Sequence, residues 1–171
     1  MTHNDPSLSS SAPTEPQAGT RTLAGALERE HREIDGGIEA FVAGTGGAAA
    51  AVEHLRTALA ALRRHIYLEE EFLFPPLRAA GLLGPIMVML LEHGELWRTM
   101  DGLEQSLVDG DPDVQRATCT ALLAALENHN GKEEQILYSQ ADTVLSEDAS
   151  AELRDFMANE ELPAGWVCQR A

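Results

Sequence analysis

The segments EHREI at residues 30–34 and HIYLEE at residues 65–70 return, in the same order, as EHGEL at residues 92–96 and HNGKEE at residues 129–134. The histidines of the first copy are 34 residues apart, and those of the second copy are 36 apart. In both longer segments a glutamate follows the histidine after four residues, so the two side chains share one face of an α-helix. The repeat predicts two similar helical hairpins whose histidines and glutamates bind metal, and its duplication favours two ions.

Apolar residues at alternating steps of three and four surround the repeat and indicate helices rather than strands. The chain has 171 residues, 44% of them hydrophobic and 5% aromatic, which suits one helical domain. Helices are predicted over about residues 22–43, 48–74, 84–108, 112–140 and 146–161, with a turn or short stub at 77–83. Short loops between long helices imply antiparallel neighbours. The predicted fold is all-α: an antiparallel up-down four-helix bundle with a short fifth C-terminal helix.

Local signals set the helix ends and the division of the chain. Thr20 or Thr22 is expected to cap the first helix, and Pro75-Pro76 must end or kink the second. Residues 1–19 are rich in Ser, Pro, Thr and Gln and are expected to form a disordered leader. Residues 20–162 would then form the bundle, and residues 163–171 a loose C-terminal tail.

The charge of the chain disfavours several classes of partner. With 28 acidic and 12 basic residues, the net charge of −16 repels nucleic acid and anionic lipid surfaces. No apolar run approaches the roughly 20 residues of a membrane span, and the first residues lack the layout of a signal peptide. The expected location is therefore the cytoplasm. The acidic surface, the fifth helix and the tail are a possible contact for a second subunit, as in a homodimer, or for another protein.

The two cysteines do not suggest a disulfide framework or a thiolate metal site. Cys119 and Cys168 are far apart and form no CxxC motif. Cys119 lies among alanines and leucines at helical spacing, which predicts a buried, inert thiol. Cys168 lies in the tail, where a reactive thiol is conceivable, but nothing nearby in the sequence lowers its pKa.

The apolar registers predict that the repeated histidines face the core. The residues that define these registers are Leu27, Ile34, Ile38 and Phe41 on the first helix; Val52, Leu55, Leu59, Leu62, Ile66 and Leu73 on the second; Ile86, Leu90, Trp97, Met100 and Leu107 on the third; and Cys119, Leu122, Leu126 and Ile136 on the fourth. His31 lies within the apolar register of the first helix, and His93 within that of the third. Glu69 continues the register of the second helix, and His129 and Glu133 continue that of the fourth. Two buried carboxylates without a basic partner are costly, and metal cations would offset that cost.

Four imidazoles and two carboxylates suit some metals better than others. One structural zinc uses four ligands, commonly thiolates, and calcium and magnesium prefer oxygen. A di-iron centre with an oxide or hydroxide bridge fits best, with manganese, mixed metals or zinc less suitable. His54 lies about 16 Å from His65 along the helix and cannot share the centre, and His3 lies in the leader. Glu70 and Glu134 are the best candidates to accept the free N–H groups of ligating imidazoles. The remaining recurring acids are predicted to be surface or supporting groups: Glu30, Glu33, Glu92 and Glu95.

The ligand pattern resembles that of the hemerythrin-like, or HHE cation-binding, domains. The resemblance rests on His31, His65-x-x-x-Glu69, His93 and His129-x-x-x-Glu133, with EFLFP at residues 71–75, and it covers about residues 22–140. It implies a four-helix bundle around an oxo- or hydroxo-bridged di-iron site. The four histidines would be terminal ligands, and Glu69 and Glu133 would bridge the two irons.

Two departures set the chain apart from the oxygen-carrying hemerythrins. Those proteins have a further histidine one turn after the third-helix ligand, where this chain has Trp97. They also use an aspartate five residues after the last histidine, whereas this chain offers Glu133 after four. The pattern is closer to a four-His, two-Glu branch that includes bacterial proteins of iron–sulfur repair. Those proteins carry adjacent N-terminal cysteines that are absent from residues 1–19, which argues against a direct repair role.

Three functions remain open from the sequence. The first is a di-iron protein that binds, senses or turns over oxygen, nitric oxide or peroxide under oxidative or nitrosative stress; whether it is an enzyme is open. The second is an iron-donating or iron-storing module, and the third is a regulatory bundle with a structural metal. Trp97, Tyr67 or Tyr138 could shape a ligand pocket, although a packing role is the more ordinary one for each.

Overall fold

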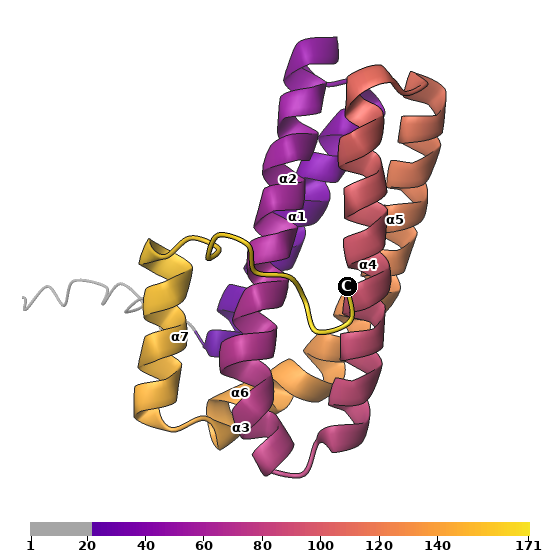
Figure 1. The fold of residues 1–171 in the computed structure, drawn as a ribbon. Helices are drawn as coiled ribbons and strands as arrows, with labels where there is room; N and C mark the ends of the chain where they lie inside the picture. Colours follow the sequence, from indigo (N-terminus) through magenta and orange to yellow (C-terminus); the bar gives the residue numbers. More distant parts are fainter. Residues whose placement is uncertain (1–21) are drawn as a thin grey trace, which may run out of the picture.

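The computed structural model describes residues 22–171, and the predicted leader, residues 1–19, lies outside the described residues. The elements are α1 (Leu23–Ala43), α2 (Ala48–Leu68), η1 (Glu69–Leu73), α3 (Phe74–Ala79), α4 (Leu83–Asp109), α5 (Pro112–Lys132), η2 (Glu133–Tyr138), α6 (Ser139–Val144) and α7 (Glu147–Asn159). Helices α1, α2, α4 and α5 form an antiparallel bundle, and α7 lies beside one end of it (Figure 1). The described part of the chain contains no strand. The predicted all-α bundle with a fifth C-terminal helix is confirmed.

The helix ends follow the predicted signals. The Thr22 side chain accepts a hydrogen bond from the Gly25 N–H at 3.1 Å and caps α1. Ser146 caps α7 in the same way. None of the described helices is long and apolar enough to span a bilayer.

The second and fourth predicted helices each contain a π-helical segment. Segment η1 follows α2, and η2 follows α5, at the two glutamates of the repeat. Pro75 and Pro76 lie in the first turn of α3, the part of a helix that tolerates proline best. The helix that was predicted to end or kink at the prolines therefore passes from the π-helical segment η1 directly into the short α-helix α3.

One predicted core residue is wrong because of η2. Ile136 was expected to face the core, but it is 44% exposed, whereas Leu137 is 1% exposed. A π-turn closes its hydrogen bond over one more residue than an α-turn, so it moves the apolar register on by one. Val52 and Leu107 are only partly buried, and they pack against the edge of the core.

The core consists of two apolar clusters separated by a polar layer. One contains Ile34, Leu55, Leu122 and their neighbours, and the other contains Leu27, Leu73, Leu137 and theirs. In α1 and α4 the repeated histidine lies between residues of the two clusters, and His129 lies between Leu126 of one cluster and Leu137, in η2, of the other. The bundle therefore encloses the predicted site between two water-excluding layers.

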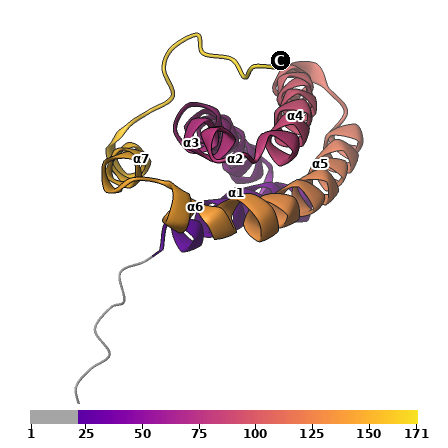
Figure 2. The ribbon, with the colours of Figure 1, turned by 90° about the horizontal axis from the view of Figure 1, so that it is seen from below.

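The C-terminal segment, residues 163–171, packs on the bundle rather than hanging loose. It runs from α7 across to α4 (Figure 2), where Arg98 donates a hydrogen bond to the Arg170 carbonyl at 2.8 Å. Gly94 permits this approach, because a Cβ there would lie 2.3 Å from the same carbonyl oxygen. Cys168 is buried and burial raises its pKa, so the structure does not favour a reactive thiol. Cys119 is fully buried, as predicted, and burial raises its pKa to about 11.

Candidate metal centre

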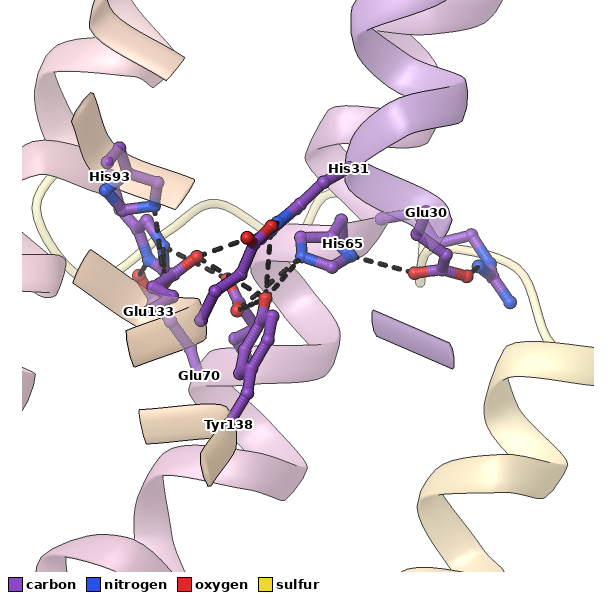
Figure 3. A network of polar contacts seen from close by, with 11 residues as sticks. Glu30, His31, His65, Glu70, His93, Glu133 and Tyr138 are labelled. Carbon is purple, nitrogen blue, oxygen red and sulfur yellow. Dashed lines mark hydrogen bonds and ion pairs between the residues drawn. The ribbon is translucent and has the colours of Figure 1, made fainter. Parts of the chain in front are cut away.

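The six predicted ligands converge in the middle of the bundle (Figure 3). They form two groups whose ligand atoms lie within 4.8 Å of one another: His31, His65, Glu69 and Glu133 in the first, and Glu69, His93, His129 and Glu133 in the second. No member is more than 4% exposed. The two glutamates belong to both groups, which is the arrangement that a pair of metal ions requires of bridging ligands.

Each shared glutamate directs one oxygen to each group. Glu69 Oε1 lies 3.5 Å from His65 Nε2, and its Oε2 lies 3.2 Å from His93 Nε2. Glu133 Oε2 lies 3.4 Å from His31 Nε2, and its Oε1 lies 3.3 Å from His129 Nε2. Segments η1 and η2 thus place their first residues between the two pairs of histidines.

The other nitrogen of each imidazole is held by a further carboxylate. His31 Nδ1 lies 2.9 Å from Glu134 and His93 Nδ1 lies 2.9 Å from Glu70, as the sequence predicted. The remaining two pairs, each at 2.8 Å, are His65 with Glu30 and His129 with Glu92. These contacts fix the ring orientations and leave every Nε2 directed to the centre, which is how ligating histidines are normally supported. The duplication therefore extends beyond the ligands to their supports.

Loss of one support should weaken metal binding without removing a ligand. Glu92 accepts hydrogen bonds from His129 and from Lys132, so Glu92→Ala frees the imidazole to rotate. We expect metal affinity to fall about 10–100-fold, measured by competition with a chelating dye. Glu95→Ala is the matched control, because Glu95 is an exposed acid of the same repeat that contacts no imidazole of the centre. Equal losses in both variants would contradict the supporting role.

Tyr138 lies at the centre, in contact with its candidate ligands, whereas the sequence suggested packing or, less ordinarily, a place in a ligand pocket. Its hydroxyl is fully buried and donates a hydrogen bond to Glu69 Oε1 at 2.6 Å. It also lies 2.9 Å from His31 Nε2, 3.0 Å from His65 Nε2 and 3.4 Å from Glu133 Oε2. All four of these atoms belong to the first ligand group (Figure 3).

The π-helix explains this position. On an α-helix, Tyr138 would lie about 140° around the axis from Glu133 and would point away from the site. Segment η2 begins at Glu133 and ends at Tyr138, and a π-turn closes over five residues. The signal in the sequence was an aromatic residue five positions after each shared glutamate, Phe74 and Tyr138.

Without metal, the site distributes its charge between imidazoles and carboxylates. Burial by itself lowers the pKa of His65, but attraction by Glu69 and a hydrogen bond to Glu30 outweigh it and raise the pKa to about 10. The pKa values of His93 and His129 are also raised, because their neighbouring carboxylates outweigh the effect of burial. Burial opposes ionisation of Glu133, yet the surrounding imidazoles hold its pKa well below the usual range. Burial and the nearby carboxylates raise the pKa of Tyr138 well above its ordinary value.

Three buried polar atoms without a hydrogen-bond partner show that this site fits a cation. Glu69 Oε2, His93 Nε2 and Glu133 Oε1 are buried and have no hydrogen-bond partner. All three are ligand candidates of the second group, and such groups are costly to bury unsatisfied. Imidazole together with carboxylate suits iron, manganese or zinc, and the set contains no thiolate. A metal ion bound to these atoms would satisfy them.

Other residues considered from the sequence lie outside the centre. Trp97 packs edge-on against Trp166, with centroids 5.5 Å apart, and lies beneath the Arg63 guanidinium at 4.5 Å. Tyr67 packs among aromatic rings near α7. His54 is exposed and belongs to neither ligand group.

Comparison with known proteins agrees with the geometry. A family model described as the hemerythrin HHE cation-binding domain matches residues 22–141. No curated protein and no solved structure matches the chain significantly. The matched range contains both ligand groups and Tyr138, so it carries the whole buried cluster suited to metal binding. The chain belongs to the hemerythrin HHE cation-binding domain family.

Proposed function

We propose that the protein is a non-haem di-iron protein that binds, senses or reacts with a small ligand such as oxygen, nitric oxide or peroxide. The observation that carries the proposal is the pair of ligand groups sharing Glu69 and Glu133. His31 and His65 would bind the first iron, and His93 and His129 the second. When bound, the irons would supply redox chemistry and coordination positions for a small exogenous ligand.

The surroundings of the site favour binding of a small ligand at metals that stay in place over transfer of iron to another protein. The ligands are almost fully buried, and an apolar cluster lies on each side of their layer. Release of iron to another protein would require the bundle to open, which makes an iron-donating role less suited to this geometry. The carboxylates on the outer nitrogens orient the imidazoles, and the apolar layers exclude bulk water.

A cavity supports access by a small ligand. It has a volume of about 600 Å³ and lies between α4 and α5. Its walls are largely small or apolar side chains, including Leu96, Ala121, Leu122 and Ala125, and it reaches His129. Such a lining suits a small, weakly polar molecule, and His129 is the member of the second ligand group among its lining residues. A role in oxidative or nitrosative stress is consistent with a ligand of this kind.

The test is anaerobic iron loading followed by metal analysis and optical spectroscopy. We expect about two irons per chain, and an oxo-bridge absorption band that forms on exposure to oxygen and changes with nitric oxide. Less than about one iron per chain after loading would overturn the proposal. Rapid transfer of the bound iron to an apo iron–sulfur acceptor, without any spectral response to oxygen or nitric oxide, would favour the iron-donor alternative.

A further inference from the structure

The duplicated halves differ at one chemically important position. Phe74 and Tyr138 each follow a shared glutamate by five residues; Phe74 comes directly after η1, and Tyr138 is the last residue of η2. Phe74 stacks on His93 with ring centroids 5.5 Å apart, and Tyr138 stacks on His31 with centroids 5.3 Å apart. His31 and His93 are themselves equivalent in the repeat. The two rings therefore occupy equivalent positions, and only one of them carries a hydroxyl.

The Tyr138 hydroxyl lies close to all four candidate ligand atoms of the first group. Its distances to the four ligand atoms of that group range from 2.6 to 3.4 Å. Adjacent ligand atoms of a metal with bonds of about 2.1 Å are about 3 Å apart. A single oxygen at such distances from all four atoms suits the apex above them.

The hydrogen bonds of the two groups show the same asymmetry. The hydroxyl contacts all four ligand atoms of the first group. In the second group, Glu69 Oε2, His93 Nε2 and Glu133 Oε1 remain without a hydrogen-bond partner. The Phe74 ring can offer those atoms neither a hydrogen bond nor a ligand.

We propose that Tyr138 is a fifth protein ligand of the first metal, so that the exogenous small ligand binds at the second metal, beside His93 and His129. The inference rests on the proposed di-iron function. Tyr138 binds as the phenolate: its O–H bond breaks, the proton leaves to solvent, and the oxygen lone pair forms the bond to the metal. The cavity between α4 and α5 is lined by His129 and by Glu92, which holds His129 Nδ1, so it lies beside the second group rather than the first.

The chain offers a clean spectroscopic test, because Tyr67 and Tyr138 are its two tyrosines. Iron-loaded, oxidised wild-type protein is compared with Tyr138→Phe and with Tyr67→Phe as the matched control. We expect a visible phenolate-to-iron charge-transfer band, with phenolate vibrations in resonance Raman spectra, for the wild type and Tyr67→Phe. Both signals should be lost in Tyr138→Phe, which keeps the ring and its stacking on His31. Azide then counts the open positions, with about one bound per wild-type chain and about two per chain of Tyr138→Phe.

Metal analysis separates failure of this inference from failure of the proposed function. Two irons per wild-type chain without a phenolate band would overturn the assignment of Tyr138 while leaving the di-iron proposal intact. The same holds if Tyr138→Phe keeps the band, or if the wild type already binds two azide ions. Less than one iron per chain in the wild type would instead refute the di-iron function on which the inference rests.

Discussion

Replacing Glu69 and Glu133 together by glutamine is expected to abolish metal binding, from about two ions per chain to none. Each glutamate lies in both ligand groups, with one oxygen directed to each, so each substitution affects both metals. An amide brings no negative charge and can bind through only one weak oxygen. The loss should exceed the roughly 10–100-fold weakening expected when a support such as Glu92 is removed. Metal analysis after anaerobic loading, and calorimetric titration, measure it.

The metal-free double variant should still fold. The two apolar clusters on either side of the site are unchanged by the substitutions, and glutamine has the size of glutamate. Helical circular dichroism should therefore persist, which separates a functional centre from a metal that is needed for folding. Unfolding of the metal-free variant while the metal-free wild type remains folded would show that the carboxylates are structural.

A second double variant serves as the matched control, because it changes the net charge by the same amount as the replacement of Glu69 and Glu133. Glu53 lies on α2 and Glu127 on α5, the helices that lead into η1 and η2, and both residues are exposed. Glu53→Gln with Glu127→Gln also removes two negative charges, but not from the centre. We expect this control to bind metal like the wild type. Equal losses in the two double variants would contradict the assignment of Glu69 and Glu133 as ligands.

The sequence predicted the fold and the placement of all six candidate ligands because both follow from helical periodicity. A spacing of four residues brings His65 near Glu69 and His129 near Glu133 whether or not the turn that follows is regular. The apolar stripes on either side then orient the histidines inward. Local signals such as the Thr22 cap also held, because they depend on adjacent residues alone.

The errors begin where the helices stop being regular. Counting at 3.6 residues per turn directed Ile136 inward, whereas η2 leaves it exposed and brings Tyr138, for which packing was the more ordinary expectation, to the site. Nothing in single-residue propensities marks a π-turn, so the duplicated aromatic position was the available clue. The supports Glu30 and Glu92 could not be told apart from Glu33 and Glu95, because that choice depends on which helix packs opposite. The docking of residues 163–171 depends on the same long-range packing at Gly94.

The metal-free and metal-loaded proteins should respond to pH in opposite directions. In the metal-free protein, the pKa of His65 is raised to about 10, against an ordinary value near 6.5, because carboxylate partners outweigh the effect of burial. The pKa values of His93 and His129 are raised as well. Groups with raised folded-state pKa values stabilise the fold fully below about pH 6.5 and lose that effect as the pH rises toward their folded values. Glu69 and Glu133 have lowered pKa values, so their contribution is present above about pH 4.5 and is lost in acid.

We therefore expect the metal-free domain to be most stable between about pH 4.5 and pH 6.5, and to lose stability steadily toward about pH 10. Metal binding must displace the imidazole protons, so metal affinity and the stabilisation by metal should rise over that same alkaline range. Thermal unfolding of both forms across the pH range tests the two trends. Titration calorimetry in buffers of different ionisation enthalpy counts the protons released on metal binding: about three per chain from the three histidines with raised pKa values, and about one more from the Tyr138 hydroxyl if it binds as the phenolate. The glutamine double variant serves as the control, because its imidazoles lose the charges of Glu69 and Glu133 and keep only the carboxylates on their outer nitrogens, so its alkaline loss of stability should be smaller. The opposite result would be a metal-free wild type that becomes more stable from about pH 6.5 to about pH 9. It would show that the imidazoles bind no more protons in the folded state than in the unfolded state, and it would contradict the predicted opposing trends.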